Sequence, residues 1–390
     1  MFRSSIRSTP RSLLVLTTSA CAVMMMVSCD SSRSCSTTTL DTGIKLANTA
    51  SIIFSGVDRQ YTSSAIYFYD PTSGLLSTIL EGESGDPFLA RNGNQVTLFN
   101  RMAGQLNHRT FDPSSSCPTN STQSATPMAE AGDPAAFVRL NDDSFLSAHP
   151  SAGRVLHWGP GLEPVDISAS WTAPIAGSAR ISDIVMSDQK IYLLHQGLNR
   201  EYLPDNSQSI IQLDLSSLKP IDADQSTSTI DHQSLFGSNP QRLHFMSDDR
   251  IATLSLCSEF LGKTCASGID YMNPSQSKPQ EATSIPVATW KLNGPVLDGG
   301  KDFVIASVKS HESSSIVRIN LIDHSYATIH TFPEQSPGCC SLIRDTQGGR
   351  IFVGDIDSSG VGGQFSIYNS NGTLETTMPL PLIPYQGLAF

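Results

Sequence analysis

The stretches SIIFSGV (residues 51–57) and PYQGLAF (residues 384–390), near the two ends of the chain, together decide the fold. The first contains β-branched and aromatic residues, the second contains two aromatic residues, and each is short enough to be a single β-strand. Elsewhere the chain carries strands of this kind in pairs, joined by a tight polar turn. The N-terminal stretch would supply the second strand of a further pair and the C-terminal stretch its first strand. We therefore predict that the two ends of the chain meet.

The complete pairs have an apolar strand, a turn rich in Asn, Asp and Gly, and a second apolar strand, which is the pattern of a β-hairpin. They are PFLARNGNQVTLF from Pro87, AAFVRLNDDSFLSA from Ala135, ISDIVMSDQKIYLL from Ile181, QRLHFMSDDRIATLS from Gln241, PVLDGGKDFVIASV from Pro295 and CSLIRDTQGGRIFVG from Cys340.

Between the pairs, further strands run into turns that usually contain Asp or Asn, whose side chains bond to the neighbouring backbone. These strands and turns are AIYFYDPTSG from Ala65, QLNHRTFDPSSS from Gln105, RVLHWGPGLEP from Arg154, SIIQLDLSSLKP from Ser209, GIDYMNPSQSKP from Gly268, SIVRINLIDHSY from Ser315 and QFSIYNSNGTLE from Gln364. A pair and the strand and turn that follow it make one four-stranded unit, which recurs seven times.

The prediction is an all-β fold: a seven-bladed β-propeller over residues 51–390, closed by pairing of a C-terminal inner strand with the N-terminal strands. Each small sheet then buries both faces against its neighbours and leaves only short edges. The repeats resemble the YVTN-repeat and NHL-like propellers, in which a strand ending in Asp-x-x-x-Gly is followed by a Pro-led inner strand and a Gly-containing turn. The rival fold is two β-sandwiches, in which the two ends of the chain would not pair.

The charge of the chain excludes one class of function. Its 390 residues include 25 Lys and Arg against 36 Asp and Glu, a formal net charge of −11, and only 16% of residues are charged. This composition favours many short strands over long solvated helices. Nothing in it would neutralise a run of phosphates, so we do not expect the protein to bind nucleic acid.

Residues 1–28 have the pattern of a lipoprotein signal peptide. Three arginines precede the apolar stretch SLLVLTTSACAVMMMVSC at residues 12–29, a charged segment followed by a hydrophobic one. The residues Met-Val-Ser-Cys that end this stretch resemble the bacterial lipobox, and the resemblance implies that Cys29 is acylated and becomes the mature N-terminus. Two alternatives stay open: acylation of Cys21, and an uncleaved anchor helix.

Residues 29–49 are polar and weakly patterned, and we predict that they form a flexible tether. Removal of residues 1–28 deletes three arginines and no acid, so the mature chain has a formal charge of −14 (−11 minus 3). The anionic lipids of the membrane repel such a chain. The lipid that is attached to Cys29 must therefore hold it to the membrane. We expect an extracytoplasmic protein of the bacterial cell envelope, either periplasmic or at the surface.

Five polar residues are candidates for a site on the rim of the propeller's central channel. Asp86, Asp133 and Asp183 lie at the starts of predicted inner strands, while Arg242 and His244 lie two apart on another, so that alternation places them on one side of the strand. An acidic rim could hold a cation or a basic partner. The alternative is structural: the two aspartates that precede Pro initiate turns, and the histidine is part of the packing.

Residues 355–360, Asp-Ile-Asp-Ser-Ser-Gly, match the first half of a calcium-binding loop. Asp355, Asp357 and Ser359 would supply oxygen ligands, and Gly would allow the sharp turn. The twelfth position is Ser366, where such loops carry a bidentate Glu, so a plain polar turn is the alternative. We expect no cofactor, and Ca²⁺ at this loop is the alternative that the sequence leaves open.

Export makes disulfide bonds plausible for the cysteines beyond the lipidation site. Cys257 and Cys265 flank a short loop and are predicted to pair. Cys339 and Cys340 are adjacent in the chain, and they bond either to each other or to different partners. The remaining cysteines available to them are Cys35 and Cys117.

No catalytic motif is present: the chain has no GxSxG, HExxH, GxGxxG, Walker or CxxC pattern. We expect a lipid-anchored binding or scaffold module that holds a protein, peptide or glycan through the long loops of its top face, including residues 118–133 and 257–267. The alternative is a propeller hydrolase or lyase, lactonase-like, with its active site at the channel mouth. The sequence leaves open whether the protein is an enzyme.

Overall fold

The computed structural model describes residues 52–389 except 61, 72, 84–85, 93–94, 103–104, 112–121, 128–133, 141–143, 160, 172–179, 188–189, 199–206, 221–231, 236–239, 247–249, 256–267, 273–282, 287–290, 301, 310–312, 333–340 and 346–348. The described residues belong to one compact unit, Thr37–Phe390, and a second unit, Met1–Ser36, lies outside them. Among the described residues, no helical segment combines the length and hydrophobicity needed to cross a bilayer.

The described residues form antiparallel sheets, which we number as blades in chain order and give from the inner to the outer strand. Blade 1 is β29 (Ile383–Ala389), β1 (Ile52–Val57), β2 (Ser64–Asp70) and β3 (Leu75–Glu83); blade 2 is β4 (Pro87–Asn92), β5 (Gln95–Met102), β6 (Gln105–Phe111) and β7 (Thr122–Pro127); blade 3 is β8 (Ala136–Arg139), β9 (Phe145–His149), β10 (Arg154–Gly159) and β11 (Leu162–Asp166).

The remaining four sheets follow the same order. Blade 4 is β12 (Ile181–Ser187), β13 (Lys190–His195), β14 (Ser209–Asp214) and β15 (Lys219–Pro220), with β16 (His232–Ser234) also on β14; blade 5 is β17 (Pro240–Phe245), β18 (Ile251–Ser255), β19 (Gly268–Met272) and β20 (Thr283–Pro286); blade 6 is β21 (Lys291–Gly300), β22 (Phe303–Lys309), β23 (Ser314–Asn320) and β24 (Tyr326–Thr331); blade 7 is β25 (Ser341–Arg344), β26 (Ile351–Ile356), β27 (Gly363–Tyr368) and β28 (Leu374–Leu380). A single 3₁₀ turn, η1 (Ser168–Ser170), follows β11 in the described chain.

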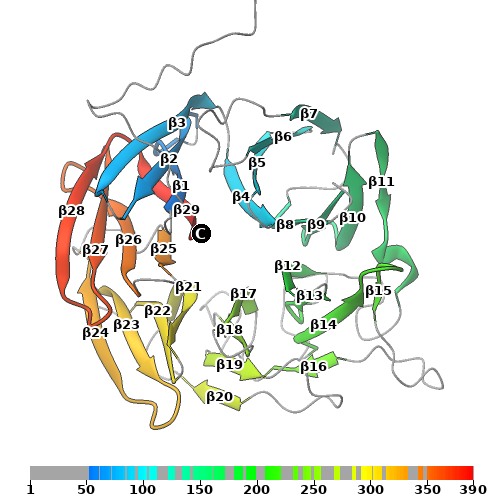
Figure 1. The fold of residues 1–390 in the computed structure, drawn as a ribbon. Helices are drawn as coiled ribbons and strands as arrows, with labels where there is room; N and C mark the ends of the chain where they lie inside the picture. The colour runs from blue at the N-terminus through cyan, green and yellow to red at the C-terminus, as the bar shows by residue number, and fades with distance from the viewer. Residues whose placement is uncertain are drawn as a thin grey trace, which may run out of the picture. The chain divides into compact units, whose positions relative to one another are not determined.

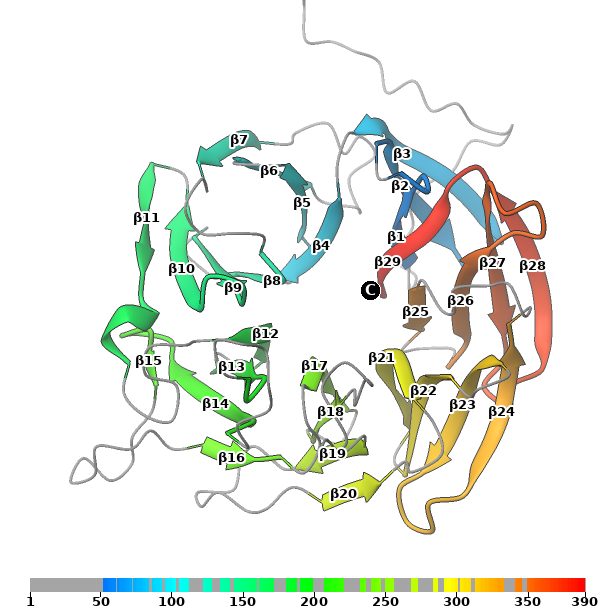
Figure 2. The same cartoon turned by 180° about the vertical axis from the view of Figure 1, so that it is seen from behind.

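The inner strands form a closed ring. Each contacts the inner strand of the next blade, in the order β29, β4, β8, β12, β17, β21, β25 and back to β29, and Figures 1 and 2 show the blades arranged around this ring. In blade 1, β29 pairs antiparallel with β1, so that Phe54 lies opposite Gly387. The prediction of a β-propeller closed by its two ends is therefore confirmed, and the rival β-sandwich fold is wrong.

The core of the described chain lies between blades. Each pair of neighbouring blades shares one cluster of buried apolar side chains. Between blades 2 and 3 the rings of Phe99 and Phe137 stack with their centroids 4.1 Å apart, and between blades 7 and 1 Phe54 and Phe365 stack at 4.4 Å. Because these clusters lie between neighbouring blades, a single blade has no core of its own, and the fold depends on closure of the ring.

The predicted Asp and Asn turn residues hold the turns between third and fourth strands. The side-chain oxygen of Asn320 accepts a hydrogen bond from the N–H of Ile322 at 2.7 Å, and that of Asp214 accepts one from the N–H of Ser216 at 2.9 Å. Two details of the predictions are wrong. Residues 118–133 are not one continuous loop, because they contain the outer strand β7, and the glycines at 299–300 belong to β21, with the turn after them.

These turns end in the left-handed backbone region. Gly74, four residues after Asp70, has a φ of 72°, as the Asp-x-x-x-Gly pattern requires, and Gly372, three residues after Asn369, has a φ of 81°. Leu218 (53°) and His324 (60°) occupy the same region without being glycine. A side chain with a Cβ is strained there.

Replacement of His324 by Gly is expected to stabilise the protein by about 0.5–1 kcal/mol, because relief of the strain exceeds the entropy cost of glycine. His324 is exposed, so little packing is lost. Leu218→Gly is the matched control: Leu218 packs against the cluster between blades 3 and 4, and its removal should cancel the gain. Denaturant unfolding of the two variants checks this, and a destabilised His324→Gly protein would contradict it.

Candidate functional site

The inner strands begin at one face of the propeller, which we call the top face. In each antiparallel blade, the links that enter the inner strand and those between the second and third strands share this face. Every inner strand pairs with a neighbour on one side only, so its other edge carries backbone N–H and C=O groups directed toward the centre of the ring. Those groups need partners, because an unpaired buried backbone group is costly.

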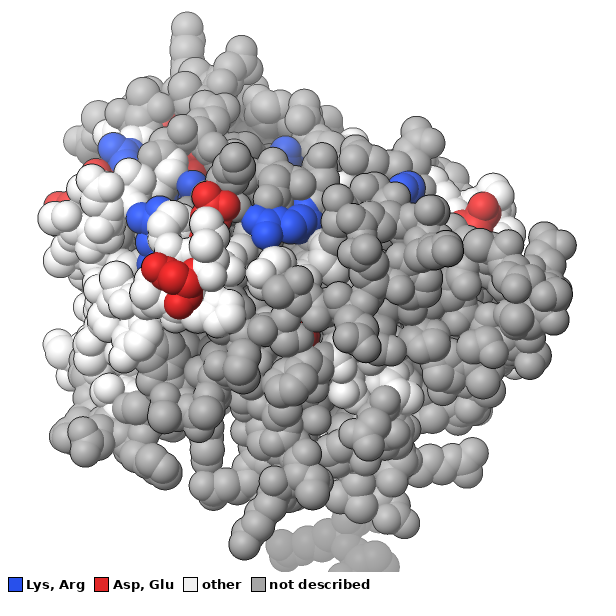
Figure 3. Space-filling view, turned by 90° about the horizontal axis from the view of Figure 1, so that it is seen from below, with Lys and Arg blue, Asp and Glu red and all other residues white. Residues whose placement is uncertain are grey.

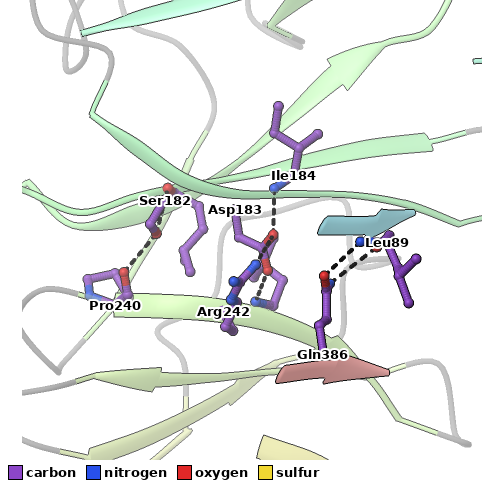
Figure 4. A network of polar contacts seen from close by, with 9 residues as sticks. Leu89, Ser182, Asp183, Ile184, Pro240, Arg242 and Gln386 are labelled. Atoms are coloured by element: carbon purple, nitrogen blue, oxygen red, sulfur yellow. Dashed lines mark hydrogen bonds and ion pairs between the residues drawn. The ribbon is translucent and has the colours of Figure 1, made fainter. Parts of the chain in front are cut away.

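Gln386 on β29 supplies such partners to the next blade. Its side-chain carbonyl accepts a hydrogen bond from the N–H of Leu89 at 2.7 Å, and its amide donates to the Leu89 carbonyl at 3.2 Å. Both bonds appear in Figure 4. A single amide side chain therefore acts as one rung of a β-ladder between β29 and β4, at the seam where the ring closes.

Asp183 and Ser182 on β12 do the same for β17. The Asp183 Oδ2 accepts a hydrogen bond from the N–H of Leu243 at 2.8 Å, and the Ser182 hydroxyl donates to the carbonyl of Pro240 at 2.8 Å. The Asp183 Oδ1 accepts one from the N–H of Ile184 at 3.0 Å. The predicted rim aspartate is thus a clamp between blades 4 and 5 (Figure 4).

Asp183 is 5% exposed, and this burial decides its electrostatics. Desolvation raises the pKa of its carboxyl group, while the nearby charge of Arg242 and the hydrogen bond from Leu243 act in the opposite direction. The Nη1 atom of Arg242 lies 3.7 Å from the Asp183 Oδ1, which is beyond hydrogen-bond distance. The two side chains form an ion pair across the seam between blades 4 and 5.

Arg242 reaches across the centre of the ring. Its Cζ atom lies 5.5 Å from the centroid of the Phe88 ring on β4, within the range of a cation–π contact. The strands β17 and β4 are not neighbours, since β8 and β12 lie between them in the ring. Phe88 is itself held by an edge-on contact with Phe137, and 43% of the Arg242 side chain is exposed. We call Asp183, Arg242, Gln386 and Phe88 the central cluster.

The structure joins two of the five predicted rim residues, Asp183 and Arg242. Asp86 directly precedes β4 and is half-buried, and His244 lies on β17 opposite Ala252 and is also half-buried. Asp133 lies outside the described residues.

The candidate calcium loop is organised as a turn. Asp357 Oδ1 accepts hydrogen bonds from the N–H and the hydroxyl of Ser359, at 3.0 and 2.6 Å, and the Ser359 hydroxyl bond is the main cause that lowers the Asp357 pKa. Asp355 is buried at the end of β26, where its Oδ1 accepts the N–H of Ile356 at 2.7 Å. Within the described ranges, no three His, Cys, Asp or Glu side chains gather as a metal site would require.

The cysteine predictions cannot be placed. Cys29, Cys257, Cys265, Cys339 and Cys340 all lie outside the described residues, so the lipidation site and both proposed disulfides stay predictions.

One face of the molecule shows how charge is distributed on part of the described surface. On the face shown in Figure 3, the described Lys and Arg side chains lie among the described Asp and Glu side chains, and neither sign gathers into a patch of its own.

Sequence reasoning missed Gln386 and Ser182. A Gln between Tyr385 and Gly387, in a strand predicted to be innermost, was the available signal, because a long polar side chain at a ring seam needs a partner.

Gln386→Ala is expected to lower the free energy of unfolding by about 1–2 kcal/mol, since both backbone groups of Leu89 lose their partner. Gln386→Glu keeps an acceptor for the Leu89 N–H but no donor for its carbonyl. Its free energy of unfolding should therefore lie between those of the wild type and the alanine variant. Urea unfolding measures both, and equal stability of all three proteins would contradict the seam role.

Comparison with known proteins finds relatives by structure only. No family model matches the chain, and no curated protein matches it. Among solved structures, the periplasmic gluconolactonase of Pseudomonas aeruginosa is similar with a TM-score of 0.60 and 13% identity, over 87% of this chain and 99% of that one.

Two other solved structures show the same fold. A quinoprotein alcohol dehydrogenase-like protein from Bacteroides thetaiotaomicron has a TM-score of 0.58 and 11% identity, over 86% of this chain and 77% of that one. AztD from Citrobacter koseri has a TM-score of 0.50 and 10% identity, over 87% and 98%. At such identities the likeness shows the architecture alone, and it agrees with the geometry: the chain is a β-propeller.

Proposed function

We propose that this protein is a ligand-binding propeller, held outside the cytoplasm by a lipid on Cys29, which binds a protein, peptide or glycan on its top face. One observation carries the proposal: the buried acid of the central cluster is used to join two blades. Both oxygens of Asp183 accept backbone N–H groups. A general acid or base must reach a proton of its substrate, whereas this carboxylate serves the scaffold.

The rigid ring supports the binding role in a second way. Blade-to-blade bonds through Gln386 and Asp183 fix the inner strands at the top face, and loops on such a scaffold are where binding residues usually lie. The fold can therefore present a stable surface without a catalytic centre.

The test uses the Cys29→Ser chain, labelled and applied to peptide and glycan arrays. Residues 257–267 are predicted to form a top-face loop, and their replacement by Gly and Ser should weaken binding of the selected ligand about tenfold or more, the loss of a few good contacts. The control replaces residues 322–325, an exposed turn at the opposite face, and should bind as the wild type does. Equal affinity of the two loop variants, or no binding at all, would contradict the proposal.

A lactonase-like hydrolase is the second candidate. The observation that favours it is the structural likeness to the periplasmic gluconolactonase. Hydrolysis of D-glucono-1,5-lactone by the wild-type chain, faster than in buffer and lost in Arg242→Met, would support it. A rate equal to that of buffer would leave the binding role as the better account.

The lipid anchor has its own test. In a bacterial host grown with labelled palmitate, the wild type and Cys21→Ser should carry label, and Cys29→Ser should not. Label that is lost with Cys21→Ser instead would move the modification to the other cysteine.

A further inference from the structure

We propose that the guanidinium of Arg242 binds the carboxylate group of the ligand at the centre of the ring. The inference rests on the proposed binding function and adds the chemical class that the site recognises. It starts from an arginine on an inner strand that is ion-paired on one side and 43% exposed. Asp183, its acidic neighbour, lies 3.7 Å from Nη1, with both oxygens already bonded to the N–H groups of Leu243 and Ile184.

The orientation of the guanidinium is held while its donors stay available. Phe88 packs beneath it at 5.5 Å and is fixed by its own contact with Phe137. A guanidinium carries five N–H donors, and the ion pair with Asp183 joins that carboxylate to Nη1 alone. With 43% of the side chain exposed, those donors can meet a ligand that enters from the top face.

A second arginine of the described chain shows what an ordinary pair looks like. Arg154 lies 3.7 Å from Asp166, and its side chain is 44% exposed. Asp166 is 28% exposed, and its Oδ1 caps the turn at Ser168 while Oδ2 faces the arginine. Arg154 is on the third strand of blade 3, away from the ring of inner strands. The two arginines match in exposure and pair distance, and they differ in location and in the burial of the acid.

The chemistry of the site favours a carboxylate over a phosphate. A guanidinium presents two parallel N–H donors at the spacing of the two carboxylate oxygens. One positive charge balances one monoanion, whereas a phosphate dianion would bring its second charge near the acid at Asp183.

The test follows ¹³C-carboxyl-labelled acetate by NMR line broadening with the full chain, at fixed ionic strength in chloride. The wild type and Arg154→Met should broaden the line equally, and Arg242→Met about tenfold less, the effect of one charge-assisted bidentate contact. Arg242→Lys keeps the charge without the fork and should give an intermediate value. If Arg242→Met does not fold, the lysine variant carries the comparison.

Two outcomes overturn the inference: equal broadening by the wild type and by the Arg242 variants, or tighter binding of inorganic phosphate than of acetate at this site, read from ³¹P linewidths. The proposed function fails separately. If acetate binding depends on Arg242 but the arrays show no ligand, the carboxylate site is supported and the proposed binding of a protein, peptide or glycan is contradicted. If array binding survives in Arg242→Met, the function stands without this site.

Discussion

A chain that ends after Leu382, and so lacks strand β29, is expected to lose cooperative folding. β29 is the inner strand of blade 1 and pairs with β1 along its length. It also contacts the inner strands of both neighbouring blades, β4 and β25. Its removal would open the ring, expose the edge of β1 and remove the Gln386 bonds to Leu89.

Packing around β29 shows that its place is specific. A Cβ at Gly363 would lie 2.4 Å from the backbone oxygen of Leu382, and one at Gly354 would lie 2.5 Å from Pro384. Glycine is needed there because the chain entering β29 passes directly over these positions. The surrounding sheets are shaped for this strand, so another segment cannot replace it.

The expected loss is comparable to the whole stability of a typical domain, about 5–15 kcal/mol. Circular dichroism and guanidinium unfolding should show no single cooperative transition, and limited proteolysis should cut the truncated chain throughout. The control replaces the outer strand β11 by Gly and Ser, a strand that pairs on one side and is mostly exposed. It should still unfold cooperatively. A truncated protein within about 2 kcal/mol of the wild type would refute the closure argument, as it would retain most of that stability.

Asp183→Ala is expected to lower the free energy of unfolding by about 2–4 kcal/mol. The N–H groups of Leu243 and Ile184 lose their acceptor in a buried place, and Arg242 loses its acidic neighbour. Asp183→Asn should lower the free energy of unfolding by less, because its amide oxygen still accepts a hydrogen bond from one of the two N–H groups. Urea unfolding of the three proteins gives the order.

The matched control is Asp166→Ala, which removes the acid at the same distance from the other arginine. Asp166 is more exposed and serves a turn, so the expected loss is about 1 kcal/mol. Equal losses for the two alanine variants would mean that Asp183 is an ordinary surface acid and that the clamp between blades 4 and 5 has no special weight.

The pH dependence of the Asp183 contribution has a definite sign. Burial raises the pKa of this carboxyl above its ordinary value, so the folded state favours the protonated form. Its contribution to stability is complete below the ordinary pKa and is lost as the pH rises through the raised pKa. The stability difference between the wild type and Asp183→Ala should therefore shrink as the pH rises above the ordinary pKa of an aspartate. A difference that grows over this range would contradict the burial argument.

The sequence by itself determined the strands, the turns and the closure of the ring. Turn residues such as Asn320 form hydrogen bonds with residues close to them in the chain, and apolar alternation is a property of one segment. Both can therefore be recognised in the sequence without knowledge of which segments pair. Pairing of the two terminal stretches could be predicted because each was a single strand, whereas elsewhere in the chain such strands recur in pairs.

Only the tertiary structure decided which polar side chains meet. Gln386 and Leu89 are 297 positions apart, and Asp183 and Leu243 are 60 apart. An inner strand leaves one edge unpaired, and the side chain that satisfies it is whichever one the ring brings within hydrogen-bond reach. That geometry belongs to the closed propeller and to no single segment, which is why an aspartate predicted for the rim proved to be a clamp between blades.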